Sequence, residues 1–453
     1  MPGKSQCHRF LAGNQILDML LYIIYLLPLA LIIWFYTRKR HVHHESSRST
    51  LAESRSAGLL EPASLHPIID ANLCVGCGSC VHACPEQPEH QVLGMIDGKA
   101  QLIGPTDCIG HGACKVACPM DAITLVFGTE TRGVDLPVVN AHFETNVPGI
   151  FIAGELGGMG LIRNALEQGR QAVEAIIKHR PRGDGKMLDL VIVGAGPAGF
   201  SAALAALSKS LHCVTLEQES LGGAVFQYPR GKLVMTAPAM LPLVGPVNFK
   251  QTSKENLLEF FRDAERKTGL RINYHERVDE VINRKEQGFL VRTPKSDYLT
   301  RNILLAIGRR GTPRKLGVPG EELPKVVYRL IDPEQYADQH VLVVGGGDSA
   351  IEAATSIAGI DGTRVTLSYR GSVIDRAKPQ NRQRLEQAVK SGSLELRLSS
   401  QVKQIKRDSV LLTYQDKQIE VGNHSVIVNA GGVLPNDFLR KVGIAIETKY
   451  GTA

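Results

Sequence analysis

The sequence predicts a multidomain α/β protein that also carries a small α+β module and one transmembrane helix. Three observations lead to this prediction. Two buried-strand patterns are each followed by a glycine-rich turn and a helical pattern, most of the nine cysteines fall within residues 74–118, and residues 16–36 form one long apolar run. At 453 residues the chain is long enough for several domains.

Charge and cysteine usage limit the class of protein. The formal net charge of +7 is mild and the body of the chain has no long Lys/Arg block, so nothing points to nucleic acid. A secreted disulfide scaffold would not confine its cysteines to one short stretch. The clustering therefore indicates metal binding in a reducing compartment.

Residues 16–36 are predicted to span a membrane. They contain one charged residue, Asp18, and their length as a helix matches the hydrocarbon core of a bilayer. The alternative is a cleaved signal peptide, which usually has a shorter apolar region and a small-residue cleavage site. Here the basic residues Arg38, Lys39 and Arg40 follow almost directly, which favours a membrane anchor.

The basic residues around this segment predict its orientation. Lys4 and Arg9 precede it, whereas a larger group, which includes Arg48, follows it. The positive-inside rule therefore places the rest of the chain on the cytoplasmic side of the cytoplasmic membrane, attached by a single span. Residues 1–15 form an N-terminal tail before the span. Residues 37–65, after the span, are basic and Ser-rich, and we expect them to form a flexible linker.

The first cysteine run has the spacing C-x2-C-x2-C-x3-C-P and consists of Cys74, Cys77, Cys80 and Cys84. This spacing is typical of iron–sulfur sites, in which three thiolates on one loop hold a cubane and the fourth serves another cluster. Glycines 76 and 78 allow the loop to wrap closely. Zinc is the alternative, but zinc sites normally pair two C-x2-C units.

A second run has the same frame and consists of Cys108, His111, Cys114 and Cys118. Residues 66–126 therefore resemble a bacterial two-cluster ferredoxin. The resemblance implies that Cys74, Cys77, Cys80 and Cys118 hold one [4Fe–4S] cluster, and that Cys108, Cys114 and Cys84 hold a second. His111 stands where the second cysteine is expected, which favours a His-ligated or a [3Fe–4S] second cluster over an empty site.

The first glycine-rich unit begins with the strand pattern of residues 188–193. Gly194 can form the tight turn, Gly196 can let the backbone approach a pyrophosphate, and Gly199 can let the helix meet the strand. A second strand ends at Glu217, whose carboxylate can bind ribose hydroxyls. The strand, helix and terminal acid together predict a dinucleotide site.

A second such unit begins at residues 341–344. Gly345, Gly347 and Ala350 occupy the glycine-loop positions, and the next strand is followed by Arg370 rather than by an acid. Because an arginine at this place suits a 2′-phosphate, the sequence favours NADPH over NADH.

Two such units resemble the thioredoxin-reductase-like flavoproteins, in which the first unit holds FAD and the second holds NAD(P)H. The resemblance implies an FAD domain at 188–322, an NAD(P) domain at 323–430 and a return segment at 431–453. It also implies that Gly222 and Gly223 lie near the isoalloxazine ring.

The segment that normally closes the FAD domain of this group occurs early in the chain. Residues 145–155 end in Gly154 and Glu155 and precede a helical pattern, and they resemble that closing flavin motif. The family usually has Asp at the position of Glu155. We therefore expect residues 127–182 to be the circularly permuted end of the FAD domain, and the alternative is an unrelated β–α linker.

Thioredoxin reductases carry a C-x-x-C motif just before the second glycine-rich loop, and the corresponding stretch of this chain, residues 332–340, has no cysteine. We therefore expect a membrane-anchored NAD(P)H:acceptor oxidoreductase that passes electrons between nicotinamide, FAD and iron–sulfur clusters. The alternatives are an NADPH-dependent disulfide reductase of a low-molecular-weight thiol and a non-catalytic membrane redox sensor. A quinone, a cytochrome and a ferredoxin all remain open as electron partners, as do the electron direction, a homodimer and the identity of any catalytic side chain.

Overall fold

The computed structural model describes residues 5–451 with short gaps at 57–58, 63–64, 88–90, 109, 132, 159, 180–186, 229, 231–232, 236–238, 250, 310, 375–376, 378 and 416, and the side chains of residues 5–26 lie outside it. The chain divides into two compact units. The first unit comprises Met1–Leu60, Pro67–Asp107 and Gly112–Thr124, and the second comprises Glu61–His66, Cys108–His111 and Leu125–Ala453.

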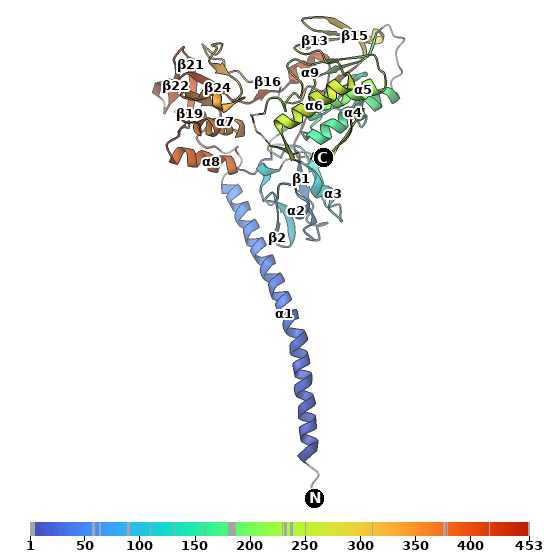
Figure 1. The fold of residues 1–453 in the computed structure, drawn as a ribbon, viewed down its shortest axis with the longest axis vertical. Coiled ribbons are helices and arrows are strands. Elements are labelled where there is room, and N and C mark those ends of the chain that lie inside the picture. Colours follow the sequence, from blue (N-terminus) through green and yellow to red (C-terminus); the bar gives the residue numbers. More distant parts are fainter. Residues whose placement is uncertain are drawn as a thin grey trace. The chain divides into compact units, whose positions relative to one another are not determined.

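The first unit begins with one long helix, α1 (Ser5–Ser56), drawn in blue in Figure 1. The predicted span at residues 16–36 lies within α1, although the side chains of residues 16–26 are not described. No helix in the described part of the chain is both long and apolar enough to cross a membrane.

The prediction of a flexible linker is wrong for residues 37–56, which continue α1. Contacts with the strands that follow explain the helix. Arg48 Nη2 lies 2.8 Å from Asp97 Oδ1, Thr50 Oγ1 donates to Gln91 Oε1, and Ser54 Oγ donates to the Ile103 carbonyl. These contacts stabilise a helix that Ser-rich composition alone would not predict.

The rest of the first unit is built from short elements around the cysteine runs. A hairpin of β2 (Leu93–Ile96) and β3 (Lys99–Leu102) turns at Asp97 and Gly98 and packs on α1. The strands β1 (His66–Ile69) and β4 (Ile123–Val126) pair with each other. The remaining elements are α2 (Ser79–Ala83), η1 (Pro105–Asp107) and α3 (Ala113–Val116).

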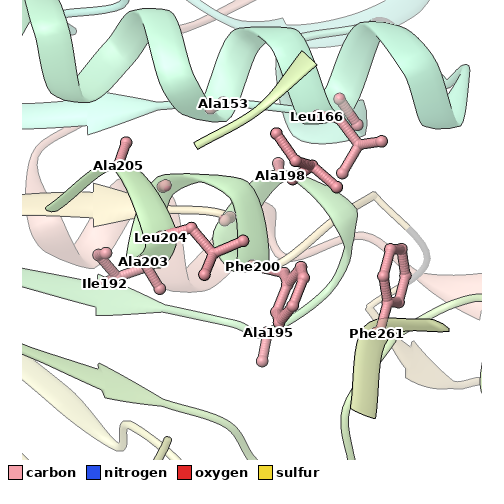
Figure 2. Packing of buried hydrophobic residues seen from close by; sticks show 14 of the residues in the cluster. Ala153, Leu166, Ile192, Ala195, Ala198, Phe200, Ala203, Leu204, Ala205 and Phe261 are labelled. Carbon is pink, nitrogen blue, oxygen red and sulfur yellow. The ribbon is translucent and has the colours of Figure 1, made fainter. Parts of the chain in front are cut away.

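The first glycine-rich unit forms β7 (Leu188–Val193), α5 (Pro197–Ser208) and β8 (Cys213–Leu216), with bounds close to those expected. β7 pairs in parallel with β8 on one side and with β15 (Asp297–Leu305) on the other. β14 (Phe289–Arg292) and β13 (Glu280–Asn283) continue the sheet as antiparallel strands. Residues Ile192, Phe200, Leu204 and Phe261 belong to its core (Figure 2).

Elements from residues 127–182 complete this sheet and its helical layer. β6 (Ile150–Ile152) pairs in parallel with the second half of β15. η2 (Glu155–Gly157) follows, and α4 (Ile162–His179) lies beside α5 (Figure 1). These segments therefore share a sheet and a helical layer with β7 and α5.

Smaller elements surround this domain. β9 (Leu233–Met235) pairs with β12 (Gln251–Ser253), β10 (Ala239–Leu241) pairs with β11 (Gly245–Val247), and the C-terminal β26 (Ile446–Lys449) pairs with β5 (Val134–Pro137). The other elements are α6 (Lys254–Thr268), η3 (Lys285–Gln287), β16 (Thr312–Pro313), β25 (Gly432–Val433) and α9 (Asn436–Val442).

The second glycine-rich unit forms a five-stranded parallel sheet in the order β17-β24-β18-β19-β20. Its strands are β17 (Val326–Val327), β18 (His340–Val344), β19 (Arg364–Ser368), β20 (Leu394–Arg397) and β24 (Ser425–Val428). η4 (Pro333–Tyr336), α7 (Asp348–Ala358), α8 (Pro379–Lys390) and the sheet of β21 (Ser400–Ile405), β22 (Ser409–Tyr414) and β23 (Lys417–Gly422) complete it.

Candidate functional site

The first glycine-rich turn is packed so tightly that side chains do not fit. A Cβ built on Gly199 would lie 1.8 Å from the Gly194 carbonyl oxygen. Gly194 has a φ of 103° and would place its own Cβ 2.6 Å from the Ala306 carbonyl oxygen. Both positions therefore require glycine for sterics, and Gly194 also requires it for its backbone conformation. This packing is the tight strand–turn–helix junction that the dinucleotide motif needs.

Glu217 is buried at the end of β8 and organises the same turn. Its Oε2 accepts a hydrogen bond from the Ala195 N–H at 2.7 Å, and its Oε1 accepts one from the Glu219 N–H at 2.8 Å. Burial raises the pKa of the Glu217 carboxyl above its ordinary value. A buried acid at this place fits the role of a ribose ligand.

The permuted segment meets the same turn. Gly154 has a φ of 83°, and a Cβ there would lie 2.8 Å from the Ala198 Cβ at the start of α5. The Gln168 side chain of α4 accepts a hydrogen bond from the Gly154 N–H at 2.8 Å. Figure 2 shows Ala198 beside Leu166 of α4 at this packed interface. Glu155 follows directly as the first residue of η2.

A third segment, Gly222–Gly223, reaches the turn from the other side. The Gly222 N–H donates to the Ala195 carbonyl at 3.0 Å, and a Cβ on Gly223 would lie 3.0 Å from the Gly196 Cα. The structure thus brings seven of the predicted flavin residues to one junction, with Glu155 next to it in the chain, and side-chain-free backbone there can approach a cofactor closely. The residues present fit FAD.

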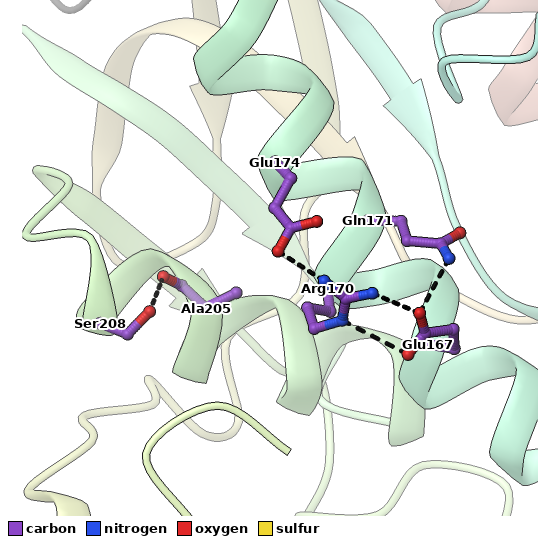
Figure 3. A network of polar contacts seen from close by, with 6 residues as sticks. All are labelled: Glu167, Arg170, Gln171, Glu174, Ala205 and Ser208. Carbon is purple, nitrogen blue, oxygen red and sulfur yellow. Dashed lines mark hydrogen bonds and ion pairs between the residues drawn. The ribbon is translucent and has the colours of Figure 1, made fainter. Parts of the chain in front are cut away.

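The helices α4 and α5 also approach each other closely at a second glycine, Gly169. A Cβ on Gly169 would lie 2.0 Å from the Ala198 carbonyl oxygen, so α4 also needs glycine here. The outer face of α4 carries a charged network in which Arg170 pairs with Glu167 and Glu174 (Figure 3). This network is partly exposed and contributes little beside the packed inner face.

The second glycine-rich turn is built differently. Gly345 is confined, because its Cβ would lie 2.4 Å from the Asn429 carbonyl oxygen and 2.9 Å from the Ala350 Cβ. A Cβ on Gly347 would meet nothing within 4 Å. Arg370 lies just beyond β19, two residues after its last residue Ser368. The residues present fit a nicotinamide dinucleotide that enters from solvent.

Four cysteines from both runs line one cavity in the first unit. The lining includes Cys74, Cys77, Cys80 and Cys118 together with Val75, Met120 and Ala100. Gly76 and Gly78 have φ values of 73° and 76°, as the tight loop requires. The structure thus brings together the four ligands that the ferredoxin resemblance assigns to one [4Fe–4S] cluster.

Burial makes several of these thiols unfavourable as free thiolates. It raises the pKa of the Cys80 thiol to about 11, and it also raises the pKa of the Cys84 and Cys114 thiols. A hydrogen bond with Ser79 instead holds the pKa of the exposed Cys77 below its usual value. Iron binding would supply the positive charge that buried thiolates need, because metal ligands must be deprotonated.

The four predicted ligands of the second cluster are divided between the two units. Cys84 and Cys114 lie close enough within the first unit to influence each other's charge. Cys108 and His111 belong to the second unit, where Cys108 Sγ lies 3.9 Å from the Leu65 carbonyl oxygen. No three acidic, histidine or cysteine side chains of the described residues are placed to hold a single metal ion. The second cluster stays a prediction.

Two contacts near these sites were not expected from sequence. Lys99 Nζ donates to the Cys74 carbonyl at 2.5 Å, and Arg329 pairs with Glu219 through both guanidinium nitrogens at 3.1 Å. Both contacts join residues that are distant in sequence. No spacing pattern signals such pairs.

Comparisons with known proteins agree with this geometry. The model of the pyridine nucleotide-disulphide oxidoreductase family matches residues 191–452, and that of the 4Fe-4S dicluster domain matches residues 66–119. The bacilliredoxin reductase of Bacillus subtilis is 28% identical over 267 residues, which cover 58% of this chain and 82% of that protein. A ferredoxin–NADP reductase of Ignicoccus hospitalis is 30% identical over 184 residues, which cover 41% of this chain and 57% of that protein.

The solved bacillithiol disulfide reductase of Staphylococcus aureus is 26% identical, with 58% of this chain and 81% of that chain covered and a TM-score of 0.49. The family model extends over more than half of the chain and includes both glycine-rich turns. The chain belongs to the pyridine nucleotide-disulphide oxidoreductase family and is an FAD-dependent pyridine nucleotide oxidoreductase with a 4Fe-4S domain.

Proposed function

We propose that this enzyme is an NAD(P)H:acceptor oxidoreductase that passes electrons between nicotinamide nucleotide, FAD and iron–sulfur clusters. The observation that carries the proposal is the cavity lined by Cys74, Cys77, Cys80 and Cys118 in the same chain as two dinucleotide turns. Bound FAD would take an electron pair from nicotinamide as one hydride and exchange single electrons with iron–sulfur clusters, which is the chemistry that joins the two kinds of centre.

The chain's own residues have distinct parts in this scheme. The turn at Gly194 and Gly196 offers backbone N–H groups at the N-terminus of α5, where a pyrophosphate is stabilised. The confined Gly345 shapes the nicotinamide dinucleotide turn, and Arg370 supplies a cation for a 2′-phosphate. These assignments favour NADPH as the electron donor.

The closing motif at residues 145–155 supports a circularly permuted FAD domain. β6 and α4 occupy the sheet edge and helical layer beside β15 and α5. If the permutation is correct, a chain that begins at Leu188 lacks part of the FAD site and should not retain FAD. Tight FAD binding by that truncated chain would refute the permuted domain.

A low-molecular-weight disulfide reductase is the second candidate, because the matching family model describes disulphide oxidoreductases. After Cys118 the sequence has only Cys213, which lies on β8. Burial raises the pKa of that thiol to about 11, so Cys213 is a poor nucleophile. A non-catalytic redox sensor is disfavoured, because a sensor does not need two intact dinucleotide turns.

The proposal includes two clusters. Cys84, Cys108 and Cys114 would hold the second, with His111 as its fourth ligand or with only three irons present. Iron analysis of anaerobically prepared protein should give about seven or eight irons per chain. About four irons per chain would limit the protein to one cluster.

We further propose that α1 anchors the enzyme to the cytoplasmic membrane, with the catalytic domains in the cytoplasm. The large apolar side chains between Leu27 and Tyr36 are about half exposed or more, and Arg38, Lys39 and Arg40 follow them. A quinone, a membrane cytochrome and a ferredoxin are the candidate partners. Retention of the full chain in carbonate-washed membranes would support the anchor, and its release would refute it.

Anaerobic titration with NADPH and with NADH tests the proposed electron transfer. Flavin absorbance and the paramagnetic signal of reduced clusters are followed in the same samples. NADPH should reduce both centres, and a Cys74→Ser variant should lose the cluster signal but keep flavin reduction. Complete reduction of flavin by either nucleotide, with no cluster reduced at any ratio of nucleotide to protein, would contradict the proposal.

A further inference from the structure

The β2–β3 hairpin lies directly against the loop that carries the first cluster cysteines. A Cβ on Gly76 would lie 2.0 Å from the Gly98 carbonyl oxygen, so the two backbones are in close contact. On the next residue, Lys99 Nζ donates a hydrogen bond to the Cys74 carbonyl at 2.5 Å. Ala100, the following residue of β3, lines the cavity itself. The ammonium group is therefore held at the edge of the cluster site.

The carboxylate of the hairpin turn is paired with cations other than Lys99. Asp97 is the carboxylate of the turn, and its Oδ1 is paired with Arg48 at 2.8 Å and with His44 at 3.2 Å. Arg40 adds a further cation, with its Nη2 3.6 Å from the position of a Cβ on Gly98. The surroundings of the hairpin therefore carry net positive charge.

One more carboxylate lies near the loop, because the Cys74 N–H donates to the main-chain carbonyl of Asp70. The Asp70 side chain is exposed, and its Oδ1 accepts a hydrogen bond from the Asn72 N–H. Exposed charges are weakened by solvent, whereas Lys99 is partly buried. Lys99 is therefore the charge that acts most strongly on this site.

We propose that Lys99 is a positioning residue that also raises the reduction potential of the cluster held by Cys74, Cys77, Cys80 and Cys118. Reduction of a cluster adds one negative charge, and a nearby ammonium group stabilises that charge. The hydrogen bond to the Cys74 carbonyl fixes the distance between cation and site. This inference rests on the proposed cluster ligation, and it makes this cluster the favoured location for an electron within the first unit.

Potentiometric titration of the full chain, with mediators and dithionite and with paramagnetic detection, tests the proposal. Lys99→Met should make reduction of this cluster about tenfold less favourable, which is 59 mV for one electron. Lys99→Arg keeps the charge and should restore most of the loss. Arg40→Met removes an exposed charge beside the same hairpin, and should have a clearly smaller effect.

A Lys99→Gln variant separates charge from hydrogen bonding, because the amide can still donate but carries no charge. A potential as low as that of Lys99→Met supports the charge effect, and a potential equal to that of the unmodified protein refutes it. An unchanged potential in Lys99→Met also overturns the proposal. Iron content is measured for each variant. If Lys99→Met fails to hold a cluster, the test uses the difference in reduction potential between Lys99→Gln and Lys99→Arg. The titration needs no nucleotide, so its outcome is independent of electron delivery from NADPH.

Discussion

The two glycine-rich turns share a motif but differ in how much space they leave. In the first turn, a Cβ on Gly199 or Gly194 would collide with backbone oxygen atoms, and three separate segments converge on the start of α5. In the second turn, Gly345 is confined like Gly194 and Gly347 faces open space much as Gly196 does, but Ala350 stands at the position of Gly199. The first strand pair ends in a buried Glu217, whereas the second is followed by Arg370.

This difference matches the different lifetimes of the two ligands at their sites. A turn closed by segments from distant parts of the chain can hold a cofactor through many catalytic cycles. A turn with an open approach lets a dinucleotide bind and leave in each cycle. The same local motif is therefore specialised by its non-local surroundings.

The largest effect is expected at the closed turn. Gly199→Val would place side-chain atoms against the Gly194 carbonyl, and it should destabilise the domain by about 4 kcal/mol or more. We expect loss of bound FAD and of cooperative thermal unfolding in purified protein. A Gly199→Val protein that keeps FAD and its melting temperature would show that the turn is not closed.

A change at the middle glycine of the second, open turn should leave the fold intact. Gly347→Leu adds a side chain where a Cβ meets no protein atom, so it should block the dinucleotide and not the fold. The rate of flavin reduction by NADPH should fall by about 100-fold. FAD content and melting temperature should match the unmodified protein, and a parallel loss of both would contradict the comparison.

Glu217 offers a sharper test of the closed turn. Glu217→Ala removes the acceptor of the Ala195 and Glu219 N–H groups and the predicted ribose ligand. Leaving buried donors unpaired costs about 1–3 kcal/mol. FAD affinity, measured by fluorescence during dilution, should weaken by about 10- to 100-fold. Unchanged FAD affinity would show that Glu217 does not contribute to FAD binding.

At the open turn, Arg370 should set the choice between nucleotides. Arg370→Gln should raise the apparent KM for NADPH by about tenfold and leave that for NADH almost unchanged. Steady-state reduction of a soluble dye measures both values. An equal change for the two nucleotides would show that Arg370 does not contact a 2′-phosphate.

The smallest effect concerns the ion pair between Glu219 and Arg329, which joins the flavin and nucleotide regions. The Arg329 hydrogen bond lowers the pKa of the Glu219 carboxyl. A depressed carboxyl pKa stabilises the fold above the ordinary value of about 4.3, and this contribution is lost as the pH falls through the lower folded value.

Because both side chains are partly exposed, Arg329→Met should cost less than about 1 kcal/mol at neutral pH, as judged by urea unfolding. The difference between variant and parent should shrink at acidic pH. A larger difference at acidic than at neutral pH would contradict this assignment of the ion pair.

Local sequence was sufficient where spacing determines structure. The strands and helices on either side of each glycine-rich turn lie close to their predicted bounds, and four predicted cysteine ligands line one cavity. Spacing succeeds in these cases because turn geometry and loop length are local properties. Residues 145–155 were predicted to resemble the closing flavin motif, and β6 within them pairs with β15.

Sequence reasoning failed where distant residues decide the structure. Residues 37–56 looked like a flexible linker, but Ser47 packs against Gly94 and Arg48 pairs with Asp97, which hold this stretch helical. The contact between Lys99 and Cys74 was missed for the same reason. Tertiary contacts override local composition in both cases.

Anaerobic stopped-flow reduction by NADPH tests the central claim most directly. The account predicts that flavin absorbance falls first and that cluster absorbance falls afterwards, with both phases lost together in the Gly347→Leu variant. Parallel assays use a variant in which Cys74, Cys77, Cys80 and Cys118 are replaced by serine. Rapid disulfide reduction that survives this replacement, with no cluster reduced by NADPH in the parent protein, would contradict the account and favour a thiol reductase.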